Sequence, residues 1–192
     1  MQSYNNKVVV VTGAGSGIGR SLAQQLSEAG AHLALSDINE KSLHETVSLL
    51  SGAGKVTLQA LDVSDRHAFE AYAEQVQADH GAVHMIINNA GVAVSETVEE
   101  LKYEDMEWIM NINFWGVVYG TKSFLPLLKM QPESAIVNIS SIFGVIALPT
   151  QSAYNATKFA VRGFTESLRQ ELKDTSVFVT TVHPGGIKTN IV

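Results

Sequence analysis

At 192 residues, with 45% hydrophobic and 17% charged residues, the chain is long enough to bury a core and too apolar to be disordered. Its formal net charge of −6 disfavours nucleic acid as a partner, because nucleic acids bind basic surfaces. The sequence contains no cysteine, which excludes disulfides, thiolate metal sites and a cysteine nucleophile.

The N-terminal stretch resembles no targeting signal. Residues 1–7 are polar, and the apolar run after them is too short for a signal peptide or a membrane span. We therefore expect a cytoplasmic protein without a membrane attachment. Neither an internal repeat nor a low-complexity linker interrupts the sequence, so we expect one domain over residues 1–192.

Apolar strands alternate with amphipathic helices along the chain. Strands are predicted over residues 8–11, 31–36, 56–61, 83–88, 135–140 and 177–183. Helices are predicted from within the turn at 13–19, over 39–50, from Ser64 or Asp65 to about 79, over 104–130 with Pro126 near the end, and over 153–173. These repeated units predict an α/β fold, a doubly wound parallel sheet (Rossmann fold) with helices on both faces. Ligands of such sheets bind beyond the carboxyl ends of the strands.

The first predicted strand, four consecutive valines, leads into a turn that reads Gly13-x-x-x-Gly17-x-Gly19. Glycines let the backbone turn sharply and approach a ligand closely. A strand, a glycine turn and a helix N-terminus form an anion site, because unpaired N–H groups and the helix dipole favour a phosphate. A purely structural turn is the alternative, since the spacing differs from the commoner G-x-G-x-x-G pattern.

Asp37 closes the second predicted strand. A carboxylate there can accept two hydrogen bonds from an adenosine ribose, and it would repel a 2′-phosphate. Ser16 stands where a basic residue could have met that phosphate, so both positions favour NAD(H) over NADP(H). The alternative is an acidic residue that is favoured by the dipole of the following helix.

The third and fourth predicted strands also end in polar residues. Asp62-Val63 follows the third strand, where Asp62 can accept from an adenine amino group and Val63 offers an apolar face. Asn88-Asn89-Ala90-Gly91 ends the fourth, and the small Ala90-Gly91 pair lets a flat cofactor lie against the backbone. A helix cap for Asp62 and a strand-end turn for the asparagines are the alternatives.

Three polar residues near the fifth strand suggest acid–base chemistry. Ser141 follows this strand, and Tyr154 precedes Lys158 by four residues on a predicted helix, so phenol and ammonium share one helix face. A nearby cation favours phenolate and would lower the tyrosine pKa from its usual value of about 10. The alternative is an exposed pair on a solvated helix face.

Taken together, these motifs resemble the short-chain dehydrogenase/reductase family, in the type whose turn reads T-G-x-x-x-G-x-G. The resemblance covers essentially the whole chain and rests on Thr12 to Gly19, Asp62-Val63, Asn88 to Gly91, Asn113, Ser141, Tyr154, Lys158 and Pro184-Gly185. It implies hydride transfer between nicotinamide and an alcohol or ketone carbon. Members of this family continue through a substrate-covering segment, a further helix and a seventh strand, so the domain is expected to be incomplete at its C-terminus.

The resemblance also implies roles for individual residues. Tyr154 would be the general acid/base, Ser141 would position the substrate oxygen, and Lys158 would bind the nicotinamide ribose and lower the tyrosine pKa. Asn113 would hold a water that connects Lys158 to solvent, and Thr189 would contact the nicotinamide carboxamide. The implied cofactor-binding residues are Gly13, Ser16, Gly17, Ile18, Gly19, Asp37, Asp62, Val63, Asn89, Ala90, Gly91, Tyr154, Lys158, Pro184, Gly185, Ile187 and Thr189.

Substrate and partners are less defined by the sequence. Apolar residues near the predicted site favour a small lipid-like, steroid or acyl substrate, with ordinary packing as the slightly preferred alternative; they are Val94, Ile142, Phe143, Val145 and Leu148. The six histidines lack ligand spacing, so no metal site is expected. By resemblance, the helices around Asn113 and Lys158 would pair in a homodimer or homotetramer. A non-catalytic dinucleotide-binding or scaffold protein, and then an epimerase or dehydratase, remain alternatives.

Overall fold

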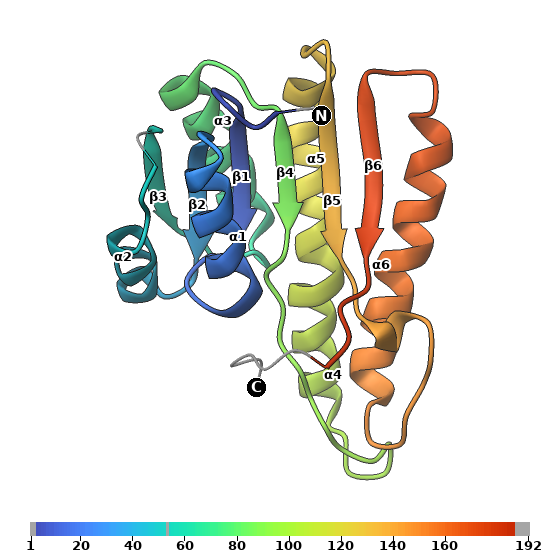
Figure 1. The fold of residues 1–192 in the computed structure, drawn as a ribbon. Helices are drawn as coiled ribbons and strands as arrows, with labels where there is room; N and C mark the ends of the chain where they lie inside the picture. The colour runs from blue at the N-terminus through green and yellow to red at the C-terminus, as the bar shows by residue number, and fades with distance from the viewer. Residues whose placement is uncertain (1–2, 53, 187–192) are drawn as a thin grey trace.

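Six parallel strands form the sheet on which the rest of the chain is built (Figure 1). The computed structural model describes residues 3–52 and 54–186. The strands are β1 (Val8–Thr12), β2 (His32–Asp37), β3 (Val56–Ala60), β4 (Met85–Asn88), β5 (Ser134–Ile139) and β6 (Val177–Val182). Their order in the sheet is β3-β2-β1-β4-β5-β6, and all five neighbouring pairs are parallel. The predicted doubly wound α/β fold is therefore confirmed.

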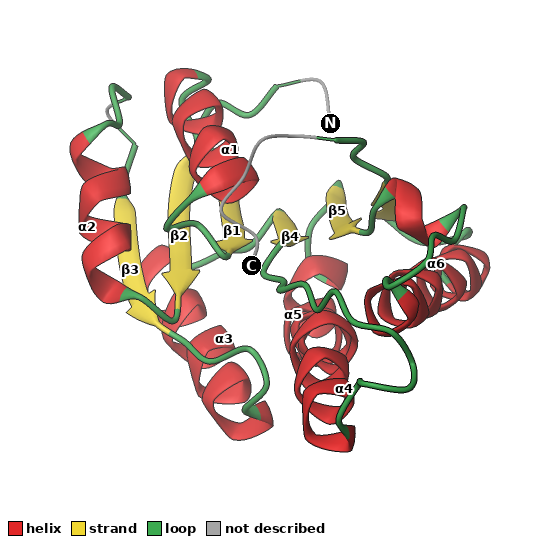
Figure 2. Ribbon diagram, turned by 90° about the horizontal axis from the view of Figure 1, so that it is seen from below, coloured by secondary structure: helices red, strands yellow, loops and turns green. Residues whose placement is uncertain are grey.

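Helices cover the sheet on both faces (Figure 2). They are α1 (Gly17–Glu28), α2 (Glu40–Ser48), α3 (Arg66–His80), α4 (Tyr103–Met110), the π-helix η1 (Asn111–Trp115), α5 (Gly116–Lys129), the 3-10 helix η2 (Ile142–Gly144) and α6 (Ser152–Glu171). Helices α1 and α2 lie on one face, and α3, α5 and α6 lie on the other. Because both faces are covered, β1 reads as an uninterrupted apolar run that is buried along its whole length.

Alternate residues of the same strands pack into two separate hydrophobic cores, one on each face of the sheet. Val9 and Val11 of β1 pack with the α1 and α2 side chains, whereas Val8 and Val10 pack toward α3 and α5. Phe69 and Phe124 are fully buried in the second core, with their ring centroids 6.4 Å apart in an edge-on arrangement. The period of two along a strand thus anchors helices on both sides of the sheet.

The strand order reverses between β1 and β4, because the chain first builds outward from β1 to β3 and then returns to the other side of β1. The loops after these two central strands diverge to opposite faces and leave a crevice at their carboxyl ends. That edge lies at the bottom of the view in Figure 1 and faces the viewer in Figure 2. The fold therefore points to this edge as the place of the site.

The region 104–130 is not the single helix that the sequence pattern predicts. Helix α4 passes into the five-residue π-helix η1 before α5 begins at Gly116. A π turn widens the helix by one residue, and it persists where tertiary contacts compensate for its poorer geometry. Asn113, in the middle of η1, is fully buried.

The starts of α2 and α3 follow local sequence signals. The Asn39 side chain accepts a hydrogen bond from Ser42 N at the start of α2, and Asp65 accepts from His67 N and Ala68 N at the start of α3. Asp65 is therefore the cap that the sequence placed at residue 64 or 65, and a capping role for Asp62 is excluded. In the described part of the chain, no helix is long and apolar enough to cross a membrane.

Candidate active site

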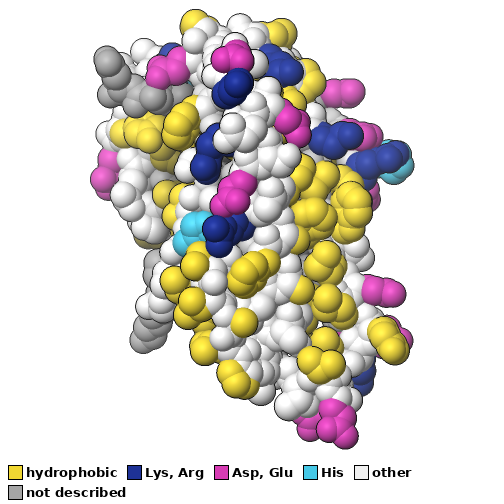
Figure 3. Space-filling model, turned by 90° about the vertical axis from the view of Figure 1, so that its right-hand side faces the viewer, with side chains coloured by type: hydrophobic (Ala, Val, Ile, Leu, Met, Phe, Trp, Pro, Cys, Tyr) yellow, Lys and Arg dark blue, Asp and Glu magenta, His cyan; other side chains and the backbone are white. Residues whose placement is uncertain are grey.

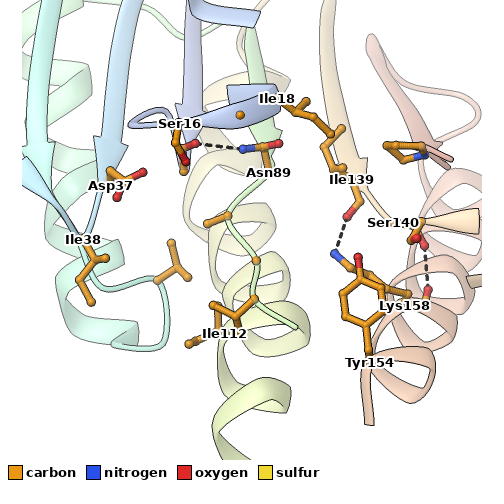
Figure 4. Close-up of a pocket in the computed structure, with 18 of the residues that line it drawn as sticks. Ser16, Ile18, Asp37, Ile38, Asn89, Ile112, Ile139, Ser140, Tyr154 and Lys158 are labelled. Atoms are coloured by element: carbon orange, nitrogen blue, oxygen red, sulfur yellow. Dashed lines mark hydrogen bonds between the residues drawn. The ribbon is translucent and has the colours of Figure 1, made fainter. Parts of the chain in front are cut away.

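A cavity of about 300 Å³ opens at the carboxyl ends of the strands, between the first glycine turn and α6 (Figure 4). Most of the predicted residues line it: Gly13, Ser16, Gly17, Ile18, Asp37, Asp62, Val63, Asn89, Ala90, Gly91, Ser141, Tyr154, Lys158, Pro184 and Gly185. Ile38, Leu61, Val92, Ile112, Ile139 and Ser140 line it as well, although the motifs do not single them out. Residues that lie far apart in the sequence thus share one cavity.

Two predicted residues lie behind the cavity wall, and two fall outside the described residues. Gly19 packs against the preceding turn, where an added Cβ would overlap the carbonyl oxygen of Gly13. Asn113 is fully buried and is bonded to Val92 and Thr157. Ile187 and Thr189 lie outside the part of the chain that the structure describes.

The glycine turn is locked onto the end of β4. Gly13 has a φ of +64°, and an added Cβ would come within 2.8 Å of Ala90 Cα. Thr12 Oγ1 accepts from the N–H groups of Asn89 and Ala90, at 3.0 Å each. The Asn89 amide donates in turn to the carbonyl oxygens of Thr12 and Gly13. Sequence reasoning quoted Thr12 in a motif but assigned it no role, because this role depends on a segment 77 residues away.

Asp37 holds the other side of the same turn. Its Oδ2 accepts from Gly15 N at 2.8 Å, and its Oδ1 accepts from Asn39 N at 3.0 Å. Each carboxylate oxygen retains a further acceptor position, and the side chain lies at the end of β2 beside the cavity (Figure 4). The carboxylate can therefore shape the turn and bind a diol at once.

Asp62 and Val63 form the wall that continues from Asp37. Asp62 Oδ1 accepts from Ser64 N at 2.9 Å and from Ser64 Oγ at 2.6 Å, which holds the carboxylate in one orientation. Val63 is 8% exposed and packs in the core shared with α3. Gly116 leaves room for it, since a Cβ there would lie 2.9 Å from Val63 Cγ2.

The polar end of the cavity is formed by Ser141, Tyr154 and Lys158. The Ser141 side chain faces the Tyr154 hydroxyl closely enough to act on its pKa, and Ser141 Oγ accepts from Phe143 N at 3.2 Å. Lys158 Nζ lies 5.5 Å from the centroid of the Tyr154 ring and donates to Ile139 O at 3.1 Å. Figure 4 shows tyrosine and lysine side by side on α6. The alternative of a solvated surface pair is excluded, because Lys158 is 3% exposed and Tyr154 is 8% exposed.

Burial dominates the protonation of this pair. It raises the pKa of Tyr154 above its ordinary value, while the hydrogen bond with Ser141 acts in the lowering direction. Burial also lowers the pKa of Lys158 to about 8, because the apolar surroundings disfavour the ammonium. The predicted lowering of the tyrosine pKa is therefore wrong for this structure, in which desolvation exceeds the lowering by Ser141.

Asn113 connects the π-helix to the cavity floor. Its Oδ1 accepts from Val92 N, and its Nδ2 donates to Val92 O, both at 2.8 Å. The same amide donates to Thr157 Oγ1 at 3.2 Å, on the helix that carries the tyrosine and the lysine. A Cβ on Gly91 would lie 3.2 Å from Asn113 Oδ1 and 3.4 Å from Lys158 Nζ, so the asparagine supports the site from behind.

The apolar residues near the site divide into two groups. Val94 and Phe143 pack against the small core of Ile109, Ala153 and Tyr154, and the Phe143 ring meets the Tyr154 ring edge-on at 6.1 Å. Ile142, Val145 and Leu148 expose between 37% and 48% of their surface. The first group supports the packing interpretation, whereas the second forms an apolar rim. Among the described residues, no group of three or more His, Asp or Glu side chains could hold a metal ion.

The cavity has the features that a dinucleotide requires. The positive-φ glycines and the start of α1 present backbone N–H groups, which suits a pyrophosphate. A carboxylate with unused acceptor positions suits a ribose diol, and a buried amine suits a second ribose beside the tyrosine. Gly13 and Ala90 lie so close that no side chain separates them, which leaves a backbone surface on which a flat group can lie.

The fold and this site define a dinucleotide-binding protein of the tyrosine–lysine type. The family model described as short chain dehydrogenase matches residues 7–192, and the chain belongs to that family.

Relatives agree with this assignment. SadH of Mycobacterium tuberculosis, whose name gives it as a candidate oxidoreductase, is 54% identical over 194 residues that cover 100% of this chain and 70% of SadH. The 3-ketodihydrosphingosine reductase of Bacteroides thetaiotaomicron is 35% identical and is matched over 95% of this chain and 65% of its own length. A short-chain dehydrogenase/reductase from Burkholderia phymatum, crystallised with NAD, superposes with a TM-score of 0.96 at 34% identity, over 100% of this chain and 69% of its own.

Proposed function

We propose that the chain is an NAD(H)-dependent oxidoreductase that transfers hydride between nicotinamide C4 and an alcohol or ketone carbon of a small apolar substrate. The observation that carries the proposal is the meeting of Ser141, Tyr154 and Lys158 at the carboxyl edge of the sheet, in the same cavity as the glycine turn. The NAD-bound neighbour and the oxidoreductase names of the relatives support it. Fold alone would not, since one fold serves many functions.

The cofactor would lie across the edge of the sheet. The glycine turn would hold the pyrophosphate, Asp37 the adenosine ribose, Asp62 and Val63 the adenine, and Lys158 the second ribose. Asn89 to Gly91, Pro184 and Gly185 would line the remaining length. When bound, the nicotinamide would supply or accept the hydride.

The proton would be handled by the side chains of α6 and the end of β5. Ser141 donates a hydrogen bond that holds the substrate oxygen, and Tyr154 gives its hydroxyl proton to that oxygen during reduction or takes it during oxidation. The raised pKa keeps Tyr154 protonated at neutral pH in the cofactor-free protein, which is the form that donates. The ammonium of Lys158, over the ring face, stabilises the negative charge that forms on the phenolate oxygen.

The substrate is proposed to be apolar beyond its reacting carbon. The exposed rim of Ile142, Val145 and Leu148 would contact it after the reacting oxygen is held by Ser141. The relative named a 3-ketodihydrosphingosine reductase supports a ketone as the reacting group.

Replacing Tyr154 by Phe tests the chemistry. We expect Tyr154→Phe to bind NADH like the wild type and to lose turnover by about 10²- to 10⁴-fold, since a positioned acid/base contributes that much. NADH affinity is measured by calorimetry, and turnover by NADH oxidation with a panel of ketones. Tyr72→Phe, at a buried tyrosine of α3 in the core, is the matched control and should keep full turnover. Equal turnover in both variants would refute the proposal; NADH binding without any turnover in the wild type would favour a non-catalytic relative.

Asp37 is tested through the choice between NADH and NADPH. Asp37→Ala removes the diol acceptor and the charge that repels a 2′-phosphate, so the ratio of NADPH to NADH dissociation constants should fall by about 10-fold or more. Asp37→Asn keeps an oxygen for Gly15 N and removes only the charge, which separates repulsion from loss of the turn. An unchanged ratio in both variants would contradict the ribose role.

The chain is further proposed to form a homodimer or homotetramer through the helices around Asn113 and Lys158, which are η1, α5 and α6. Phe114 of η1 meets Phe164 of α6 edge-on at 6.2 Å, and Trp115 stacks on Tyr119 at 5.8 Å. Trp115 nevertheless exposes 43% of its surface. These four residues are called the aromatic patch below.

A further inference from the structure

The proposed reaction depends on the distance between two separate elements. Ser141 follows β5, whereas Tyr154 and Lys158 lie on α6, and the nine residues 145–153 separate the end of η2 at Gly144 from Tyr154. The covalent connection alone does not fix the distance between a hydroxyl on one element and a phenol on the other. Non-covalent contacts must therefore set the geometry. The Asn155 amide of α6 donates to Phe143 O and Ile146 O beside η2, and the end of β5 contacts α6 at Lys158.

Lys158 is held at both ends by two consecutive residues of the β5 terminus. Its amine donates to Ile139 O at 3.1 Å, and its backbone carbonyl accepts from Ser140 Oγ at 2.9 Å (Figure 4). All of these groups are buried, since Ser140 is 2% exposed and Lys158 is 3% exposed. The hydroxyl of Ser140 therefore joins the sheet directly to the turn of α6 that carries the lysine.

The neighbouring residues Ser140 and Ser141 contact different groups. Both side chains meet α6 at different groups: Ser140 Oγ donates to the backbone carbonyl of Lys158, whereas Ser141 lies against the Tyr154 hydroxyl. Ser140 N also donates to Val182 O at 2.8 Å, which ties the same residue to β6. The single hydroxyl proton of Ser140 is thus donated to the helix carbonyl and is not available to a substrate.

Gly144 shows how tightly this contact is enclosed. A Cβ at Gly144 would overlap Ser140 Oγ and would lie 2.8 Å from Lys158 O. The Gly144 amide donates to Ser141 O at 2.8 Å, so η2 folds back over the strand end. Strand, 3-10 helix and α6 therefore converge on one buried hydrogen bond.

We propose that Ser140 is a positioning residue, whose hydroxyl sets the place of α6 relative to the end of β5 and thereby the distances among Ser141, Tyr154 and Lys158. The proposal rests on the proposed function, because these distances matter only if the three residues act on one substrate oxygen. A small displacement is enough to matter, since misplacing reacting groups by about 1 Å can reduce a rate by about 100-fold.

The same strand provides a matched control. Ser134, at the other end of β5, is 1% exposed, and its Oγ donates to the α5 carbonyl of Leu128 at 2.8 Å. Ser134→Ala and Ser140→Ala therefore each remove one buried hydroxyl that joins β5 to a helix carbonyl. Only the second removes it next to the lysine.

The test compares both variants of the full chain in kinetics and in lysine titration. We expect Ser140→Ala to reduce kcat for NADH-dependent ketone reduction by about 10- to 100-fold with little change in KM, and to move the pH profile of kcat. Ser134→Ala should stay within about twofold of the wild type in kcat. Ser140→Cys, which retains a weak donor of similar size, should recover part of the loss. Equal kcat and equal pH profiles for the two alanine variants would overturn the proposal.

A second measurement does not depend on turnover. The titration of the Lys158 amine, followed by ¹³C NMR of the lysine Cε, should shift in Ser140→Ala and stay unchanged in Ser134→Ala. If the wild type turns over no substrate but the titration shifts as expected, the proposed function fails and the positioning of the lysine stands. If Tyr154→Phe abolishes turnover while Ser140→Ala changes neither kcat nor the titration, the positioning role alone fails.

Discussion

The amine of Lys158 lies where its charged form is disfavoured. Burial lowers its pKa to about 8 from an ordinary value of 10.5. Below the folded-state pKa both folded and unfolded chains carry the proton, and the folded chain then bears the whole penalty of the buried charge. Between about pH 8 and 10.5 the folded chain loses its proton first, so this group makes the free energy of unfolding rise with pH. The lysine that is proposed to serve catalysis is thus unfavourable for stability at neutral pH.

This argument predicts that Lys158→Met stabilises the protein at pH 7 while removing turnover. The gain should be about 1–3 kcal/mol, because the shift corresponds to about 3 kcal/mol and leaving Ile139 O without its donor returns part of it. Urea unfolding of both proteins at pH 7 and at pH 10 measures the difference, which should shrink at the higher pH. A variant that is less stable than the wild type at pH 7 would contradict the assignment of a buried, strained charge.

For individual residues, the sequence indicated which side chains meet, but not how burial changes their pKa values. Asp37, Tyr154 and Lys158 could be singled out because each chemical type stood at a strand end or on one helix face. The direction of the tyrosine pKa shift could not be predicted, since it depends on how much of the ring the fold covers. Thr12 and Ser140 received no predicted role, because they bind backbone groups of distant segments and leave no pattern of their own.

Among the elements, the π-helix η1 departs most from its sequence pattern. The strand of four valines could be predicted from local chemistry alone, since β-branched residues suit a strand that is covered on both faces. The region from Tyr103 to Lys129 reads as one helix, yet it contains a π turn around Asn113. The turn is held by bonds to Val92 and Thr157, which a local periodicity cannot reveal.

Replacing Asn113 by Leu should therefore release the π-helix from the loop after β4. The two bonds to Val92 and the bond to Thr157 are lost together in a buried place, so we expect a loss of about 3 kcal/mol in the free energy of unfolding. Hydrogen exchange at the Val92 amide should accelerate at the same time. Urea unfolding and exchange monitored by NMR provide the two measurements.

Asn111→Leu, at an exposed position in the same π-helix, is the control for that substitution. It should change the free energy of unfolding by no more than about 0.5 kcal/mol and leave the Val92 amide protected. Similar losses in both variants would mean that the π turn tolerates no leucine anywhere, and the anchoring role of Asn113 would be wrong.

On the scale of the whole molecule, hydrophobic and charged side chains separate on the face that includes α6. Hydrophobic side chains gather over the lower half of this face, while most lysine and arginine side chains lie in its upper half (Figure 3). Gly163 lies on the exposed side of α6, and an added Cβ would meet nothing within 4 Å. A glycine lowers helix stability by about 1 kcal/mol relative to alanine, and no contact within the described chain requires one there. The close approach of a second chain to α6 would account for a glycine at this position.

A substitution in the aromatic patch tests whether a second chain packs on these helices. If a second copy covers Trp115, then Trp115→Glu places a carboxylate in an apolar interface, and the assembly should dissociate because an unpaired buried charge is unfavourable by several kcal/mol. Light scattering should give the mass of a dimer or tetramer for the wild type and of a single chain for the variant. Phe178→Glu, at an aromatic residue of β6 with 67% of its surface exposed, is the control and should leave the mass unchanged. A wild-type mass of one chain at every concentration would exclude the assembly, and the exposed aromatic rings would then need a different partner.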